Sequence, residues 1–183
     1  RPKIVLTSSI QAEKDNPYGT SKRHAEGAVS QFAEETGAAV RIYRLKNVFG
    51  KWCRPNYNSV TATFCHNIAH DLPIAISDPA REIELVHVDD IVEAFVGELD
   101  FTGAPRPVFA GDDLPCYRIA LGDLAGRIQA FHDMRTTLKT SDFSVRFNRQ
   151  LYGMYTSYLA PDAWDYALEV KRDERGSLAE FIK

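Results

Sequence analysis

The first 45 residues carry two short apolar runs separated by a stretch with helical periodicity. The run KIVL (residues 3–6) ends at Thr-Ser-Ser (residues 7–9), which predicts a buried strand of a parallel sheet. From Tyr18 to Thr36, apolar or small residues recur at helical spacing, and Gly37 supplies the stop signal of a helix. The apolar residues of AAVRIYRL (residues 38–45) predict a second strand.

A polar segment, KNVFGKWCRPNYNS (residues 46–59), follows the second predicted strand. It mixes turn-forming residues with aromatic and cationic ones, so we expect a loop that contacts a ligand rather than one that fills a core. Asn58 or Ser59 has a side chain able to cap a helix, and we predict a helix from there to about Asp71.

Strand-like and helix-like segments continue to alternate beyond residue 71. Strands are predicted at Ile74–Ile76, Ile83–Val88 and Val108–Ala110. Helices are predicted at residues 91–99 and at residues 119–134, where apolar side chains fall on one stripe. This alternation is typical of a doubly wound α/β fold.

The pattern changes after Asp142. Residues 143–166 are rich in aromatic side chains but weakly periodic, and we expect them to pack against a further domain or a second subunit rather than line a ligand site. Residues 168–183 resemble the start of a β-rich module. We therefore predict two parts, residues 1–142 and residues 143–183.

Composition narrows the classes of protein that fit this chain. Its 183 residues are 44% hydrophobic and 26% charged. The net charge of −3 does not indicate the basic surface that nucleic-acid binding requires. No apolar run is long enough to predict a membrane span. Cys53, Cys65 and Cys116 are odd in number and widely spaced, which favours reduced thiols in a cytoplasm. His66 and His70 stand four residues apart but lack an evident third ligand, so no metal site is expected.

Tyr18 and Lys22 stand four residues apart at the start of the first predicted helix. Their side chains therefore lie on one helix face, and an ammonium group beside a phenol stabilises the phenolate, which favours acid and base chemistry. Ser9, at the carboxyl end of the preceding strand, lies at the edge where open α/β sheets bind ligands. Pro17 is expected to fix the helix entry, and Gly19 to leave room for a ligand. This spacing alone is common on helices, so its meaning depends on the neighbouring motifs.

Those motifs carry a family resemblance. The predicted strand ending in Ser-Ser is followed by the motifs PYGTSK (residues 17–22) and RLKNVFG (residues 44–50). Together, these features resemble the extended short-chain dehydrogenase/reductases of the NAD-dependent epimerase/dehydratase family. The resemblance implies the C-terminal part of a Rossmann-like doubly wound parallel sheet plus a nucleotide-sugar-binding subdomain. It also implies NADP(H) or NAD(H) as the cofactor and a UDP-sugar as the substrate.

The resemblance assigns roles to five residues. Ser9 would orient the sugar hydroxyl or keto group, with Ser8 as the alternative. Tyr18 would move the proton of that group. Lys22 would bind the nicotinamide ribose and stabilise the phenolate, and Tyr18 and Leu45 would also contact the cofactor.

Further matches imply substrate contacts. Asn47 corresponds to a family asparagine that contacts the nucleotide-sugar, and Asn58 to a position near the diphosphate; turn formation or capping is the alternative role of both. Trp52 is expected to stack on uracil or the sugar, or else to plug the domain edge. The diphosphate-binding arginine of many relatives is missing from its usual position, and Arg81 or Arg54 is expected to substitute for it.

VHVDDIV (residues 86–92) resembles a family segment in which two aspartates open a helix and order the site. We interpret Asp89 and Asp90 as helix caps rather than catalysts.

A narrower resemblance comes from SSIQAEKDNPYG (residues 8–19) and FGKWCRPNYNSVTATFC (residues 49–65). Both resemble bifunctional bacterial enzymes of UDP-N-acetyl-L-fucosamine synthesis for capsules and O-antigens, in which a reductase domain precedes a cupin domain. The resemblance implies reduction to a UDP-2-acetamido-2,6-dideoxy-L-talose by a cytoplasmic homodimer.

The glycine-rich G-x-x-G-x-x-G loop that receives the cofactor pyrophosphate in this family does not occur in the sequence. We therefore expect the 183 residues to be a fragment of an intact enzyme, and to bind the cofactor weakly or not at all when alone.

Two other functions fit parts of the pattern. An epimerase or 4,6-dehydratase uses the same scaffold, but a dehydratase normally has an Asp-Glu pair where Ile10 and Gln11 follow Ser9. A non-catalytic binding fragment is the third hypothesis, because the glycine-rich loop is missing.

Overall fold

The computed structural model describes residues 3–100, 107–165 and 167–181, which belong to two units. Unit 1 consists of Arg1–Val48 and Glu84–Cys116, and unit 2 consists of Phe49–Ile83 and Tyr117–Lys183. The predicted boundary between residues 142 and 143 is a different division of the chain, and it stays a prediction.

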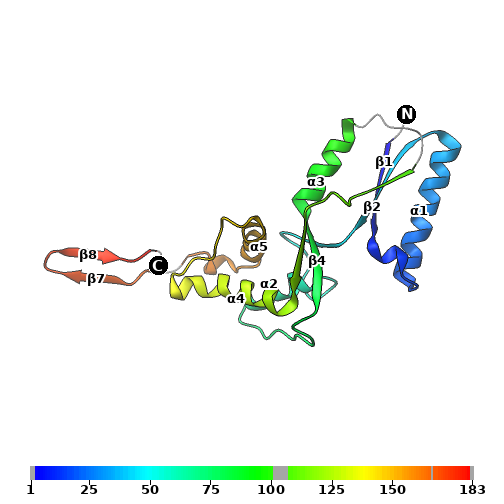
Figure 1. Ribbon diagram of the computed structural model, residues 1–183. Coiled ribbons are helices and arrows are strands. Elements are labelled where there is room, and N and C mark those ends of the chain that lie inside the picture. The colour runs from blue at the N-terminus through cyan, green and yellow to red at the C-terminus, as the bar shows by residue number, and fades with distance from the viewer. Residues whose placement is uncertain (1–2, 101–106, 166, 182–183) are drawn as a thin grey trace. The chain divides into compact units, whose positions relative to one another are not determined.

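Unit 1 is built on a parallel sheet with the strand order β1-β2-β5 (Figure 1). Its elements within the described residues are β1 (Lys3–Ser9), η1, a 3-10 helix (Ile10–Glu13), α1 (Pro17–Thr36), β2 (Ala39–Leu45), α3 (Val88–Gly97), η2, a second 3-10 helix (Glu98–Asp100), and β5 (Pro107–Ala110). Ser9 pairs with Leu45 in the β1–β2 register, so the ends of these two strands lie side by side.

The two faces of this sheet are covered by different helices. On one face, Val40 and Ile42 of β2 pack with Ala33 of α1. Successive strand residues point to opposite faces, so Tyr43 lies on the other face, where its ring meets Phe95 of α3 edge-on at 4.9 Å between centroids. Helices on both faces of a parallel sheet confirm the predicted α/β class.

Three strands carry the chain between the units. They are β3 (Asn47–Phe49), β4 (Glu82–His87) and β6 (Cys116–Ala120), which pair in the order β3-β4-β6. The remaining elements belong to unit 2: α2 (Val60–Ala69), α4 (Leu121–Thr137), α5 (Arg146–Thr156), η3 (Pro161–Ala163), β7 (Val170–Asp173) and β8 (Gly176–Ala179).

Aromatic side chains form the core of unit 2, where α5 packs against α2 and α4. Phe131 of α4 meets Tyr152 of α5 edge-on at 5.3 Å between ring centroids, and Phe147 meets Phe49 at 5.6 Å. The residues predicted to be weakly periodic therefore include a helix that fills a core. Tyr166, the last residue of the predicted aromatic tract, lies outside the described residues.

Several local predictions are wrong. Residues 74–76 are irregular instead of forming a strand, although Ile74 and Ile76 are half-buried and Ala75 is exposed, because alternation alone does not provide a pairing partner. The predicted ligand loop contains β3, and β6 was not predicted at all. Asp89 and Asp90 lie inside the first turn of α3, whose cap is His87, with its Nδ1 accepting from the Asp89 backbone N–H at 3.3 Å.

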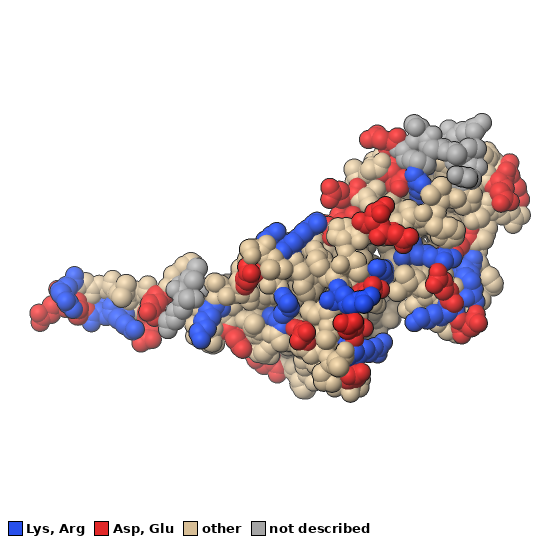
Figure 2. All heavy atoms as spheres, viewed as in Figure 1, with Lys and Arg blue, Asp and Glu red and all other residues tan. Residues whose placement is uncertain are grey.

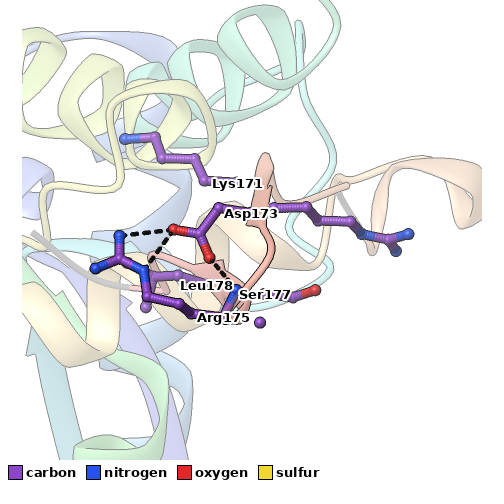
Figure 3. Close-up of a pocket in the computed structure, with 7 residues that line it drawn as sticks. Lys171, Asp173, Arg175, Ser177 and Leu178 are labelled. Carbon is purple, nitrogen blue, oxygen red and sulfur yellow. Dashed lines mark hydrogen bonds and ion pairs between the residues drawn. The ribbon is translucent and has the colours of Figure 1, made fainter.

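The β7–β8 hairpin has exposed side chains at every strand position. Figure 3 shows Arg175 in the turn donating to Asp173, with Nη2 at 2.8 Å and Nε at 3.2 Å from Oδ2. The hollow beside this turn, of about 350 Å³, is lined by hairpin residues alone. Its walls are exposed strands, so it is a poor candidate for a ligand site.

Candidate functional site

The carboxyl end of β1 presents two serines with different environments. Both are buried, and the Ser8 hydroxyl donates to Glu26 Oε1 at 2.5 Å. Ser9 points to the other side of the strand, and its Oγ accepts from the Gln11 backbone N–H at 3.1 Å, which caps η1. A hydroxyl that accepts one hydrogen bond still has a proton to donate, so Ser9 retains a donor for a ligand.

The first turn of α1 is set by Asn16, Pro17 and Gly19. The Asn16 side chain accepts from the Gly19 backbone N–H at 2.8 Å, and Pro17 occupies the first helical position. A Cβ atom at Gly19 would lie 2.2 Å from the Gln11 carbonyl oxygen and 2.4 Å from that of Lys14. The prediction that Gly19 leaves room for a ligand is therefore wrong, since the chain's own backbone fills that space.

Tyr18 and Lys22 lie together on α1 as the spacing predicts. The Lys22 Nζ is 5.6 Å from the centroid of the Tyr18 ring, and it donates to the Thr7 carbonyl oxygen at 3.1 Å. Tyr18 is 47% exposed, so its phenol is accessible. The backbone contact ties the lysine to β1 two residues before Ser9.

An ion pair that the sequence analysis missed lies one turn beyond Lys22. Glu26 is 5% exposed, and Arg44 donates to both of its oxygens, from Nε at 2.9 Å and from Nη2 at 2.7 Å. These hydrogen bonds from Arg44, with the one from Ser8, hold the pKa of Glu26 below its usual value despite burial. The sequence signal for this ion pair was the spacing of Glu26, which stands four residues after Lys22 and continues the series Tyr18, Lys22 and Glu26.

A small cavity of about 100 Å³ lies at the carboxyl ends of the unit 1 strands. Its lining residues come from η1, β2, the link between β2 and β3, β4 and the segment after β5: Ile10, Glu13, Arg44, Leu45, Lys46, Val86, Gly111, Asp112 and Leu114. Open α/β sheets bind their ligands at this edge, and the predicted cofactor residue Leu45 is among the lining residues.

Asn47, also in unit 1, is exposed, and its side-chain amide donates to the Glu84 carbonyl oxygen at 3.0 Å. The side chain therefore already ties β3 to β4. Its amide oxygen can still accept a hydrogen bond from a ligand.

The other predicted substrate residues lie in the unit 2 segment before α2. Trp52 is 83% exposed with a positive φ of 63°, and the Arg54 guanidinium lies 5.3 Å from the Tyr57 ring centroid. Asn58 is exposed and precedes the cap of α2, which is Ser59, whose Oγ accepts from the Ala62 backbone N–H at 3.2 Å. Capping is thus excluded as the role of Asn58.

Arg81, the alternative to Arg54 as a diphosphate ligand, is exposed and lies immediately before β4. Its backbone N–H donates to the Asp78 carbonyl oxygen at 3.2 Å, and its own carbonyl oxygen accepts from the Leu121 backbone N–H at 3.0 Å. The backbone is fixed, while the guanidinium faces solvent.

Other kinds of site find little support in the described residues. Within them, no group of three or more His, Cys, Asp and Glu side chains has the geometry of a metal site, and His66 and His70 stack at 4.4 Å between ring centroids. Figure 2 shows acidic and basic side chains interspersed over the visible surface. Among helices in the described part of the chain, none combines the length and apolarity needed to cross a membrane.

Comparison with known proteins adds to this geometry. The sequence model of the NAD dependent epimerase/dehydratase family matches residues 2–107. UDP-2-acetamido-2,6-beta-L-arabino-hexul-4-ose reductase from Pseudomonas aeruginosa is 43% identical over 180 residues, which cover 98% of this chain and 48% of that protein. The chain thus spans about half the length of this curated relative.

Solved structures are also similar. The capsular polysaccharide assembling protein CapF from Staphylococcus aureus is 40% identical, with a TM-score of 0.87 over the whole of this chain and 50% of that one. The Bordetella bronchiseptica enzyme WbmF in complex with NAD+ and UDP is 14% identical, with a TM-score of 0.67 over 85% of this chain and 58% of that one. The second likeness concerns the fold alone, and both agree with the predicted α/β class.

Proposed function

Because the chain belongs to the NAD-dependent epimerase/dehydratase family, we propose that it forms the catalytic part of a nucleotide-sugar reductase. The substrate class is a UDP-linked 4-keto-6-deoxy-N-acetylhexosamine, and the product is UDP-2-acetamido-2,6-dideoxy-L-talose. The name of the Pseudomonas aeruginosa relative, a reductase of a UDP-linked hexulose, supports this substrate class. The name of the Staphylococcus aureus protein supports a role in capsule synthesis.

The observation that carries the proposal is the Tyr18–Lys22 pair on α1, tied to β1 beside Ser9. Lys22 holds this pair to β1 two residues before Ser9, and a phenol, an ammonium group and a hydroxyl are the groups that reduction of a carbonyl requires. The reaction needs a proton for the carbonyl oxygen and a means of stabilising the phenolate that remains.

The residues act on the carbonyl oxygen and its proton. Ser9 donates a hydrogen bond to the oxygen and orients it, while Tyr18 transfers its proton to the oxygen as the alcohol forms. Lys22 stabilises the resulting phenolate by its positive charge. The Lys22 ammonium has three donors, of which Thr7 accepts one, so it also suits the ribose hydroxyls of a cofactor.

A nicotinamide cofactor, when bound, supplies the hydride that the carbonyl carbon accepts. Lys22, Tyr18 and Leu45 would hold its nicotinamide end; of these three, Leu45 lines the cavity of about 100 Å³ at the carboxyl ends of the strands. The sequence has no G-x-x-G-x-x-G loop, so we place the pyrophosphate site in a part of the intact protein outside these 183 residues.

In unit 1, Asn47 offers its amide oxygen to the substrate. In unit 2, Trp52 offers an exposed indole for stacking, Arg54 offers a cation for the diphosphate, and Asn58 offers an amide. Both sets are compatible with a UDP-sugar.

Turnover of NADPH by the intact protein tests the proposal. With UDP-4-keto-6-deoxy-N-acetylhexosamine as substrate, Tyr18→Phe is expected to lower kcat by at least about 10², the lower end of what a positioned proton donor contributes. Tyr152→Phe, which removes the phenol hydroxyl of a half-buried residue of unit 2, serves as the control and should keep wild-type kcat. A Tyr18→Phe variant with unchanged kcat would remove Tyr18 from the mechanism, and a wild-type protein without turnover would overturn the proposed function.

A further inference from the structure

We propose that Glu26 and Arg44 are positioning residues of this reductase. Their ion pair fixes the position of α1 along β1 and β2 and its rotation about the helix axis. This placement sets Tyr18 and Lys22 beside Ser9. The inference rests on the proposed function, because it concerns the geometry of the proton-transfer group.

The three side chains Tyr18, Lys22 and Glu26 follow one another at intervals of four residues and share one face of α1. Tyr18 is 47% exposed, Lys22 is half-buried, and Glu26 is 5% exposed, so the series runs from solvent into the protein. Tyr18, at the exposed end of the series, carries the proposed proton transfer. Glu26, at the buried end, is the anchor, the residue that attaches α1 to the sheet.

The anchor is attached to β1 next to the proposed catalytic hydroxyl. Ser8 Oγ donates to Glu26 Oε1, while Lys22 Nζ donates to the Thr7 carbonyl oxygen. These contacts involve the two residues immediately before Ser9, so they fix the position of α1 along β1 relative to that serine.

Arg44 joins the anchor to the rest of unit 1. Its Nε and Nη2 contact both oxygens of Glu26, and its Nη1 donates to Glu13 Oε1 at 3.0 Å. The guanidinium also lies 4.6 Å from the centroid of the Phe109 ring. One side chain therefore connects α1, η1, β2 and β5.

The rotation of α1 about its axis requires a directional contact, which the apolar core does not supply. Val29 and Ala33 pack α1 against the sheet, but apolar packing is non-directional and leaves rotation of the helix weakly specified. A two-bond contact between a guanidinium and a carboxylate has a defined geometry. Since buried ion pairs add little net stability compared with apolar residues of similar size, fixing this geometry is the better reason for the pair.

The test is steady-state kinetics of Glu26→Gln in the intact protein, measured well below the melting temperature of each variant. Displacement of a catalytic group by about 1 Å can cost 10²-fold, so we expect kcat to fall by about 10-fold for a partial displacement. KM for NADPH should rise in the same variant, because Lys22 is also a proposed cofactor contact. The pH at which kcat falls on the alkaline side should move upward, because a displaced Lys22 stabilises the phenolate less. Glu34→Gln, which changes an exposed carboxylate of the same helix, is the matched control and should behave as wild type.

Arg44→Gln should reproduce the loss of kcat, and the double variant with Glu26→Gln should lose no more than the worse single variant, because both act through one pair. If Glu26→Gln does not fold, Ser8→Ala carries the test, since it removes only one hydrogen bond to Glu26; it should lower kcat and shift the pH profile in the same direction.

The outcomes separate the two proposals. A wild-type protein without turnover overturns the proposed function and this inference with it. Turnover that is lost in Tyr18→Phe but has the same kcat and pH profile in wild type and in the folded Glu26 or Ser8 variants overturns the positioning role alone.

Discussion

At the scale of single residues, the proposed unit 1 site is built around one buried carboxylate. Glu26 is surrounded by donors from Ser8 and Arg44, and its pKa in the folded protein is lowered below the ordinary value of 4.5. A lowered pKa means that the folded state favours the charged form. The stability that Glu26 contributes is therefore present above pH 4.5 and is lost as the pH falls through its folded-state pKa.

This linkage gives a prediction for Glu26→Gln. At neutral pH the variant should lose about 2 kcal/mol of unfolding free energy, below the roughly 3 to 5 kcal/mol for breaking a fully buried pair. The discount follows from the Arg44 side chain, which remains 30% exposed. Thermal melting of wild type and variant from pH 7 to pH 3 should show the difference shrinking below pH 4.5. A difference that is constant with pH would mean that ionised Glu26 does not contribute.

The contrast between Tyr18–Lys22 and Glu26–Arg44 shows which site contacts a sequence can reveal. Tyr18 and Lys22 lie on one helix, so their spacing alone predicts their proximity, and the structure places them as expected. Arg44 lies on a different element from Glu26. Only the parallel pairing of β1 with β2, which sets Ser8 beside Arg44, brings this ion pair together.

At the scale of secondary-structure elements, the approach of η1 to α1 depends on Gly19. Its missing Cβ accommodates two backbone carbonyl oxygens, at 2.2 and 2.4 Å from where that atom would be. Gly27 in the same helix has nothing within 4 Å of that position, which makes the two glycines a matched pair.

Gly19→Ala should cost about 3 kcal/mol of stability, because backbone atoms rather than a flexible side chain must move. It should also lower kcat of the intact protein, since the displaced turn carries Tyr18. Gly27→Ala should instead stabilise the protein by up to about 1 kcal/mol, the difference between Gly and Ala in a helix interior. Denaturant unfolding and turnover of both variants check this, and equal behaviour of the two would show that the η1 contact is unimportant.

Elements with local signals were predictable, and those that depend on distant partners were not. The end of α1 was marked by Gly37, which adopts the left-handed conformation with a φ of 68°. By contrast, β6 is a short strand of the β3-β4-β6 sheet, whose members are far apart in the sequence. The helix α5 is stabilised by aromatic packing on α4 and by its contact with α2, which its own sequence did not reveal.

At the scale of the whole molecule, the family resemblance read from PYGTSK (residues 17–22) and RLKNVFG (residues 44–50) is confirmed by the match over residues 2–107. The sequence, however, carries only part of what a reductase needs. The proposed catalytic residues are here, whereas the glycine-rich loop that binds a dinucleotide pyrophosphate does not occur in it. Since the chain spans 48% of its Pseudomonas aeruginosa relative, cofactor affinity should depend on the remainder of the intact protein.

Thermal shift with NADPH tests that dependence. A ligand at about 100 times its Kd stabilises the folded state by about 2.7 kcal/mol, so the intact protein should melt at a clearly higher temperature in its presence. The 183-residue chain has the residues proposed to hold the nicotinamide end but no G-x-x-G-x-x-G loop, and its melting temperature should not change. Equal stabilisation of both would place the whole cofactor site within these residues, and the proposed division of the binding site would then be wrong. UDP serves as a second ligand, because its predicted contacts at Trp52 and Arg54 lie within the chain and do not require the missing loop.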